Sequence, residues 1–188
     1  RPGLLVSRFD RVLDDTGNAV SLAVEDAAQV LGLYPADKYL VSAETAAHAL
    51  ADLCAARVVA ARELFRQLCF AWVTGNGDVH AKNLSVLAGP TGEWRVSPAY
   101  DLPSTLPYGD STMALTIGGR SDGLSRRILL ALAADLGIPE SAAVRVVDAV
   151  LAATAGIADD VAAGVVPLPK HRLRTWERSL RHRRSTAS

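Results

Sequence analysis

The chain has 188 residues, which is enough for one compact domain or for one large lobe of a bigger domain. Apolar residues make up 49% and charged residues 21%, so the composition excludes wholesale disorder. Lys plus Arg and Asp plus Glu both total 20, and no apolar run approaches the roughly 20 residues of a membrane span. We therefore expect a cytoplasmic, globular protein, and the low aromatic content of 5% favours close-packed helices over a β-sandwich.

The two cysteines, Cys54 and Cys69, lie in apolar segments and lack a CxxC spacing. Neither a disulfide framework nor a zinc site is expected from them. We predict that both are small, reduced core residues, because free cysteines are usually buried.

The first 35 residues contain turn and capping signals. Leu4–Val6 predicts a short strand that leads into a polar connection, and Asp14–Asn18 is typical of a turn. Ser21 predicts the cap of a short helix that runs through Leu31 and is ended by Gly32 and Pro35.

Two longer helices are expected next, over residues 44–56 and 58–73, because their apolar residues recur at helical spacing. Two apolar stretches, 84–87 and 94–96, then flank a Gly/Pro turn and predict a β-hairpin.

The remainder of the chain, after a loop over residues 97–112, is predicted to be helical. Helices are expected near 125–136 and 139–155, and another after Pro167 or Pro169. The fold class is therefore α+β: a helical body that carries one small hairpin.

The residues with the clearest chemical pattern lie around this hairpin. Asp78 and Asn83 are five residues apart, as in the HRDxxxxN loop of protein kinases, and Asp101 follows the second strand. Phosphoryl transfer needs one carboxylate to orient the accepting hydroxyl, and an amide and a second carboxylate to hold Mg²⁺. The hairpin would fold Asp101 back to face the loop, and such oxygen ligands suit Mg²⁺ rather than zinc. The alternative is ordinary turn chemistry, since Asp, Asn and Gly are common in turns and His80 alone is more often structural.

Two stretches, Gly77–Ser85 and Val96–Thr105, resemble the C-terminal kinase domain of the HipA toxin family. These are bacterial serine/threonine kinases distantly related to phosphoinositide kinases. Leu5–Arg11 is similar to the hinge strand of the family, and the resemblance covers most of residues 4–138.

The resemblance implies a mainly helical C-terminal lobe of a protein-kinase-like fold, with the metal site on the hairpin. Its parts would be a hinge strand at 1–11, helices over 12–74, the catalytic loop, hairpin and metal-binding segment over 75–105, and a helical remainder over 106–188. The implied site residues are Asp78 as the catalytic carboxylate, Asn83 and Asp101 as Mg²⁺ ligands, and Ser7, Phe9, Asp10, His80 and Lys82 as the groups around ATP. Ser7 and Phe9 would meet adenine, Asp10 the ribose, and His80 and Lys82 the phosphates. Where the family commonly has an acidic residue, this chain has Ser7, so only a backbone contact would survive there.

The family's phosphate loop and its Lys–Glu pair precede the hinge, whereas only three residues precede Leu4 here. We therefore expect the 188 residues alone to bind ATP poorly and to have little kinase activity unless an N-terminal lobe or a partner chain completes the cleft. The resemblance also implies a DNA-binding, HipB-like antitoxin as partner and a protein substrate, among the family's targets an aminoacyl-tRNA synthetase.

The C-terminal segment 170–188 carries a net charge of +6, which leaves −6 on the rest of the chain. Its basic residues are Lys170, Arg172, Arg174, Arg178, Arg181, Arg183 and Arg184. Leu173, Trp176 and Leu180 share one helical face and predict an apolar stripe toward the body, with most arginines outward. A solvated terminal helix and a DNA contact through phosphates both fit this pattern.

Two other functions remain open at this point. A lipid or small-molecule kinase would share the Gly-Asp-x-His-x-x-Asn pattern, although Tyr100-Asp101-Leu102 stands where those enzymes carry Asp-Phe-Gly. A non-catalytic lobe that binds an antitoxin or DNA is the other alternative.

Overall fold

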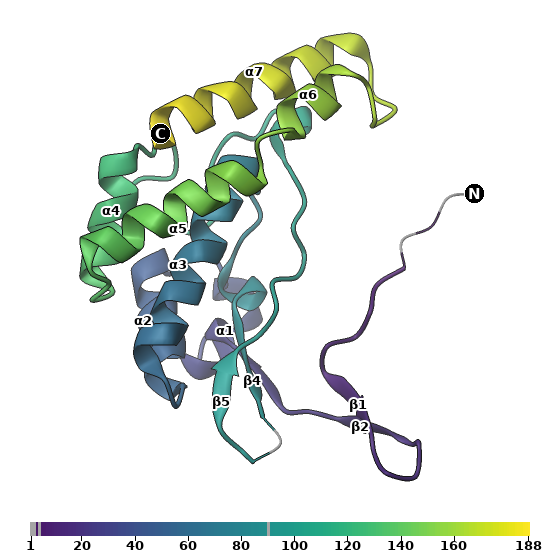
Figure 1. Cartoon of the computed structure of the whole chain (residues 1–188), viewed down its shortest axis with the longest axis vertical. Coiled ribbons are helices and arrows are strands. Elements are labelled where there is room, and N and C mark those ends of the chain that lie inside the picture. Colours follow the sequence, from purple (N-terminus) through teal and green to yellow (C-terminus); the bar gives the residue numbers. More distant parts are fainter. Residues whose placement is uncertain (1–2, 4, 90) are drawn as a thin grey trace.

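The computed structural model describes residues 3, 5–89 and 91–188, and it consists of a helical body with two small antiparallel sheets (Figure 1). One sheet pairs β1 (Arg11–Leu13) with β2 (Ala19–Ser21), and the other has the order β3 (Val24–Asp26), β4 (Ser85–Ala88), β5 (Trp94–Val96). The α-helices are α1 (Ala27–Val30), α2 (Ala43–Leu53), α3 (Arg57–Thr74), α4 (Arg126–Asp135), α5 (Glu140–Ala153), α6 (Ile157–Ala162) and α7 (Lys170–Ala187). Short 3₁₀ turns are η1 (Pro35–Asp37), η2 (Ala81–Asn83) and η3 (Leu106–Tyr108). The predicted α+β class is confirmed.

The predicted hairpin is strands β4 and β5, which pair in register Val86 with Val96. The sequence patterns did not indicate that β3 joins this hairpin from the other side, with Asp26 opposite Ser85. β4 is therefore the buried central strand of three, and it begins two residues after Asn83.

The N-terminal segment differs from the prediction. Leu4 lies outside the described residues, and residues 5–8 form no strand because no neighbouring strand pairs with their backbone. The first strand is instead β1, whose hairpin with β2 projects from the body and is exposed along its length (Figure 1). The predicted turn at Asp14–Asn18 closes this hairpin, since Asp14 Oδ1 accepts hydrogen bonds from the backbone of Thr16 and Asn18.

The predicted helix cap at Ser21 is wrong, because Ser21 ends β2. The cap of α1 is Asp26, whose side chain accepts from Gln29 N while the Gln29 side chain accepts from Asp26 N. This reciprocal pair satisfies two backbone donors at the helix start, which explains why the helix begins five residues later than expected. The segment assigned to helices, 12–74, thus also contains three short strands.

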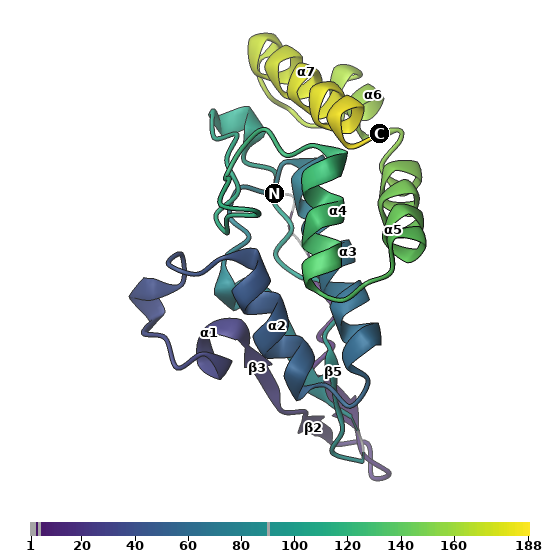
Figure 2. The same cartoon turned by 90° about the vertical axis from the view of Figure 1, so that its left-hand side faces the viewer.

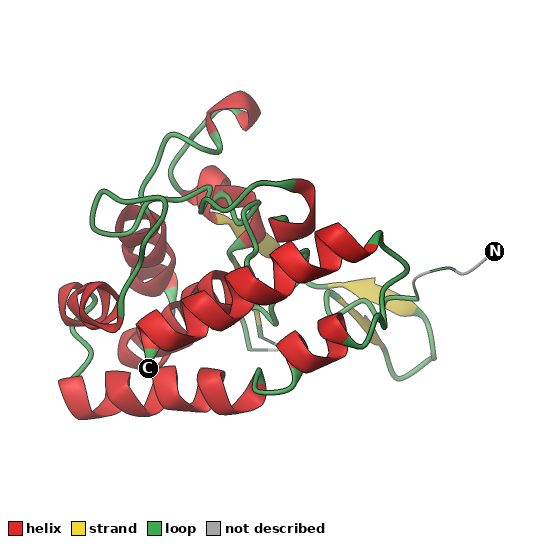
Figure 3. Ribbon diagram, turned by 90° about the horizontal axis from the view of Figure 1, so that it is seen from above, coloured by secondary structure: helices red, strands yellow, loops and turns green. Residues whose placement is uncertain are grey.

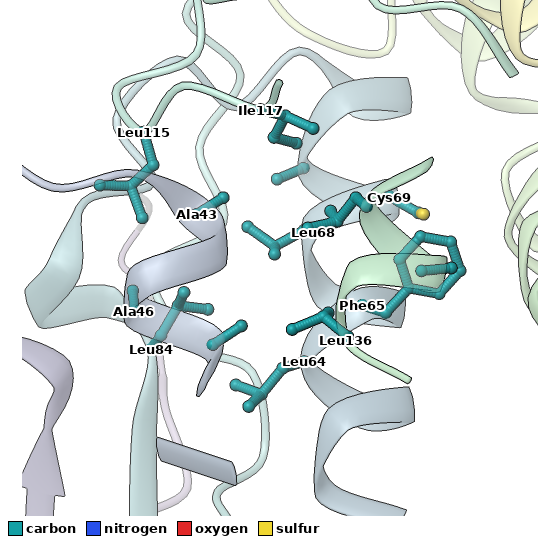
Figure 4. Close-up of a cluster of buried hydrophobic side chains, with 14 of the residues drawn as sticks. Ala43, Ala46, Leu64, Phe65, Leu68, Cys69, Leu84, Leu115, Ile117 and Leu136 are labelled. Carbon is teal, nitrogen blue, oxygen red and sulfur yellow. The ribbon is translucent and has the colours of Figure 1, made fainter. Parts of the chain in front are cut away.

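Helix α3 is the centre of the core, and it packs against α2, α4, α5 and α7 (Figures 1 and 2). Figure 4 shows side chains of α2 and α3 meeting Leu84, Leu115, Ile117 and Leu136 from distant parts of the chain. Cys54 and Cys69 are free and buried, as predicted. Burial raises the pKa of both thiols.

One segment, Glu140–Ala162, has the length and mean hydropathy (1.5) of a membrane-spanning helix. In the structure it is two helices, because α5 ends at Ala153 and α6 begins at Ile157. Only one face of α5 is buried, through Ala143, Val147, Val150 and Leu151. Length and composition are therefore weak evidence for a span here.

The basic C-terminal helix α7 lies across the body beside α6 (Figure 3). Leu173, Trp176 and Leu180 pack toward α6 as the predicted apolar stripe. Most arginines of α7 are exposed, as predicted, whereas two turn inward: Arg183 is 3% exposed and donates to Trp72 O at 2.8 Å, and Arg184 donates to Leu151 O at 2.8 Å. These two arginines of the basic segment therefore have a structural role.

Candidate functional site

The loop that carries the candidate site begins where α3 ends at Gly75. This glycine has φ 73°, in the left-handed region, and a Cβ there would lie 2.2 Å from Leu106 Cδ1. Both the backbone conformation and the close contact require glycine. The chain consequently turns sharply from the buried helix into Asn76–Asn83.

Asn76 joins the two parts of the site and was missed by sequence reasoning. It is fully buried, its Nδ2 donates to Asp101 O at 3.3 Å, and its Oδ1 accepts from Asp78 N at 3.0 Å. One amide side chain thus links the backbone at Asp78 to the backbone at Asp101. An asparagine between two glycines reads as a turn residue in the sequence, which conceals this role.

Asn83 and Asp101 lie next to each other, as the hairpin predicted. Asn83 Nδ2 donates to Asp101 Oδ2 at 2.9 Å, and Asn83 Oδ1 accepts from His80 N at 3.1 Å. Asp101 has φ 53°, which is uncommon for a residue other than glycine. The hydrogen bond from Asn76 to its carbonyl helps hold this conformation, which directs Asp101 back to the loop.

Asp78 and His80 are held by two residues from the segment after η1. Tyr39 Oη donates to Asp78 Oδ1 at 3.1 Å, and Lys38 Nζ lies 2.8 Å from His80 Nε2. Burial, and then the Lys38 ammonium, lowers the pKa of His80, while the carboxylates of Asp78 and Asp101 oppose that shift. Because an ammonium group can only donate, Nε2 of His80 is the acceptor in its contact with Lys38. Asn76 is the link between Asp78 and Asp101, because its side chain hydrogen-bonds to the backbone of both residues.

Lys82 is exposed on η2, and its carbonyl oxygen accepts from Tyr100 Oη at 2.6 Å. The same phenol hydroxyl pairs with Ser85 Oγ. Tyr100 thereby ties the segment before Asp101 to the start of β4.

A cavity of about 460 Å³ lies beside Asp101 and is lined by the predicted hinge residues Ser7, Phe9 and Asp10. The Phe9 and Tyr100 rings lie 5.7 Å apart on its wall. The remaining lining residues are Val6, Arg8, Val24, Pro98 and Ala99. Asp78, His80, Lys82 and Asn83 do not line this cavity, so the structure brings the hinge residues to Asp101 but not directly to the loop.

Asp10 is engaged in ion pairs at the mouth of this cavity. Arg8 Nε donates to its carboxylate at 2.7 Å, and Arg11 Nη1 does so at 2.6 Å. The hydrogen bond from Arg8 is the largest cause that lowers the pKa of Asp10 to about 2.

The donor set around Asp101 fits a hard cation that takes further ligands from a phosphate. Asp101 is exposed, and within the described ranges its carboxylate receives one hydrogen bond, from Asn83. Asn83 Oδ1 accepts one hydrogen bond and keeps a second lone pair. The described residues hold no group of three His, Cys, Asp or Glu that could bind a metal by themselves. Mg²⁺ usually binds through one or two protein ligands together with phosphates and water.

Comparison with known proteins assigns the chain to a family. The model of the HipA-like C-terminal domain matches residues 1–157. The chain belongs to this family. The HipA resemblance read from the two motif stretches is thus confirmed.

Named relatives of this HipA-like chain are described as kinases. "Putative kinase Y4dM" of Sinorhizobium fredii is 34% identical over 151 residues, which cover 73% of this chain and 33% of that protein. "Putative kinase Y4mE" of the same organism is 37% identical over 128 residues, covering 64% and 30%. The chain therefore spans about a third of the length of the curated relatives it matches.

The fold is also that of a solved HipA structure. The complex of HipA, HipB and operator DNA from the Shewanella oneidensis MR-1 toxin–antitoxin system contains a chain that matches with a TM-score of 0.72 at 24% identity. The match covers 95% of this chain and 47% of that one. The HipA-like fold is established by this likeness.

Proposed function

We propose that this chain is the catalytic lobe of an ATP- and Mg²⁺-dependent serine/threonine protein kinase of the HipA type. The observation that carries the proposal is the contact between Asn83 and Asp101, with Asp78 joined to the same centre through Asn76. A carboxylate, an amide and a second carboxylate are the groups that phosphoryl transfer requires. The kinase names of the relatives support the same reaction class.

Asp78 is the proposed catalytic carboxylate. It is half-buried in the loop that follows α3, and its Oδ1 is already oriented by a hydrogen bond. In this role it accepts the proton of the substrate hydroxyl and orients the hydroxyl oxygen toward the phosphorus.

The cavity beside Asp101 is the proposed adenosine site. Its apolar walls and the paired rings of Phe9 and Tyr100 suit a flat purine, and Ser7 and Phe9 offer backbone groups to its edge. Asp10 would meet the ribose by exchanging one of its arginine partners for a sugar hydroxyl. His80 and Lys82 are proposed to lie beside the phosphates, where the exposed Lys82 ammonium offsets negative charge.

Asn83 and Asp101 are the residues that would hold Mg²⁺. When bound, the ion neutralises charge on the phosphate oxygens. The two side chains touch before any ligand enters, so their spacing is set by the protein.

The solved relative was captured with HipB and operator DNA, which supports a HipB-like antitoxin and DNA as partners of the family. We propose the same partners here, a cytoplasmic location, and a protein substrate such as an aminoacyl-tRNA synthetase. Phosphorylation would add about −1.5 to −2 charges to that substrate.

The test is transfer of the γ-phosphoryl group of ATP by the complete polypeptide that carries this chain. We expect Mg²⁺-dependent transfer to serine or threonine, and a loss of about 1,000-fold in Asp78→Ala. Asp15→Ala is the matched control, since Asp15 is exposed in the distant β1–β2 turn. Equal activity in Asp78→Ala, or transfer to lipid but not to protein, would refute the proposal.

A further inference from the structure

Two adjacent residues, Lys38 and Tyr39, contact Asp78, His80 and Ala81 in the loop that carries the proposed catalytic carboxylate. The Lys38 carbonyl accepts from Ala81 N at 3.1 Å, and Lys38 Nζ lies 2.8 Å from His80 Nε2. Tyr39 Oη donates to Asp78 Oδ1 at 3.1 Å, and its ring meets the His80 ring edge-on at 5.2 Å. These contacts are tertiary: they join two segments that lie about 40 residues apart in the sequence.

We propose that Tyr39 is a positioning residue for Asp78 and that Lys38 anchors Tyr39 against the loop. This inference rests on the proposed kinase function. The terminal torsion of an aspartate is soft, so a carboxylate without a partner samples a broad range of orientations. Among the described residues, Tyr39 is the hydrogen-bond partner of the Asp78 carboxylate.

The hydrogen bond from Tyr39 gives the two carboxylate oxygens of Asp78 different roles. Oδ1 is occupied by the phenol hydroxyl, so Oδ2 is the oxygen left to face the acceptor. In the transfer step, the acceptor oxygen bonds to the γ-phosphorus and the bond from phosphorus to the bridging oxygen breaks. ADP leaves, and the proton of the acceptor hydroxyl passes to Oδ2 of Asp78. The Tyr39 proton stays on Tyr39 throughout.

Lys38 is placed to support Tyr39, because the segment between Leu33 and Val41, which both pack against the core, is largely exposed. Tyr39 is 46% exposed, and its neighbours Tyr34 and Leu40 are 79% and 77% exposed. Lys38 holds this segment to the loop through its backbone and its side chain, and its ammonium also lies 4.8 Å from the centre of the Tyr39 ring. In this proposal, the substrate hydroxyl meets Asp78 beside Tyr39, and Lys38 orders Tyr39.

The test uses Tyr39→Phe in the complete polypeptide, with a mixture of peptides that carry a central serine or threonine as the acceptor. This variant removes one hydroxyl and keeps the ring against His80. We expect kcat to fall about tenfold, with the KM for Mg·ATP and the melting temperature unchanged. Tyr34→Phe is the matched control, because it removes an exposed hydroxyl from the same segment, and it should behave as the wild type.

A double-mutant cycle tests the anchoring role of Lys38. We expect Lys38→Met to lower kcat, and Tyr39→Phe to have a smaller effect in that background than alone, since both act through Asp78. Wild-type kcat in Tyr39→Phe, or the same loss in Tyr34→Phe, would overturn the positioning role, and fully additive effects would overturn the anchoring role. If the wild type transfers no phosphoryl group at all, the kinase proposal falls and this inference falls with it, a result distinct from an active wild type with an equally active Tyr39→Phe.

Discussion

The Nδ2 atom of Asn83 lies 2.9 Å from Oδ2 of Asp101, although 18 residues and a complete β-hairpin separate them. β4 starts just after Asn83 and β5 ends shortly before Asp101, so the pairing of these strands returns the chain to its starting point. The side chain of Asn76 also donates a hydrogen bond to the Asp101 carbonyl oxygen. This closure makes one centre from two sequence motifs.

Asn76 is predicted to be required for the geometry of the site. Asn76→Ala removes the partners of Asp101 O and Asp78 N, and we expect the free energy of unfolding to fall by about 1–3 kcal/mol. Urea denaturation measures this change, with Asn18→Ala in the exposed β1–β2 turn as a control within about 0.5 kcal/mol of wild type. A neutral Asn76→Ala would show that the buried amide does not hold the two segments together.

The carboxyl of Asp10 should titrate far below an ordinary aspartate. The hydrogen bond from Arg8, together with the charges of Arg11 and Arg8, lowers its pKa from 3.8 to about 2, so Arg8→Ala should move the titration upward. Because the folded-state pKa is depressed, the stability this ion pair contributes is present above pH 3.8 and is lost as the pH falls through 2. Carbon-13 NMR of the side-chain carboxyl measures both values, with the remote Arg120→Ala as control. An unchanged titration in Arg8→Ala would contradict the pairing.

Arg183 is predicted to be the most costly basic residue of α7 to replace. It donates to Trp72 O at 2.8 Å and to Ser111 O, and its guanidinium lies 3.8 Å from the centre of the Trp72 ring. Burial lowers its pKa to about 10, so it remains charged at neutral pH. Arg183→Met leaves two carbonyl acceptors without this donor, and we expect a loss of about 3 kcal/mol in the free energy of unfolding.

The exposed Arg178 provides the control for that measurement. Arg178→Met should change stability by about 0.5 kcal/mol or less. An equal loss in the free energy of unfolding for the two variants would show that the buried contacts of Arg183 do not stabilise the fold.

If α7 contacts DNA, only part of its charge is available. Among the described residues, Lys170, Arg172, Arg174 and Arg178 are exposed and have no acidic partner, whereas Arg181 pairs with Asp159 and Glu177. Four phosphate contacts predict a slope of about −3.6 for the logarithm of the binding constant against the logarithm of salt concentration. Fluorescence anisotropy with duplex DNA measures the slope, which Arg178→Glu should reduce. Binding that is insensitive to salt would exclude this surface.

The sequence predicted those features of the site that depend on local patterns. The hairpin, the helix predicted over 58–73 and the approach of Asp101 to Asn83 follow from turn residues and from the spacing of apolar residues. The roles of Lys38 and Tyr39 could not be predicted this way. Their contacts join segments about 40 residues apart, and no periodicity or spacing encodes such a contact.

The errors in the predicted fold have a similar cause. β3 was missed because three residues become a strand only when β4 lies beside them. The sequence pattern did not identify Arg183 as one of the inward arginines, because the carbonyl oxygens that accept its hydrogen bonds belong to α3 and to the loop at Ser111. The positions of β3 and Arg183 depend on tertiary partners, which the local sequence does not identify.

The most direct test of the central claim is calorimetric binding of ATP to the complete polypeptide, with Mg²⁺ and with EDTA. If Asn83 and Asp101 hold the ion, ATP should bind the wild type and Asp15→Asn tightly only when Mg²⁺ is present. Asp101→Asn should weaken that binding by about tenfold or more, and its affinity should no longer respond to Mg²⁺. An Asp101→Asn variant that binds Mg·ATP as tightly as the wild type would contradict the account.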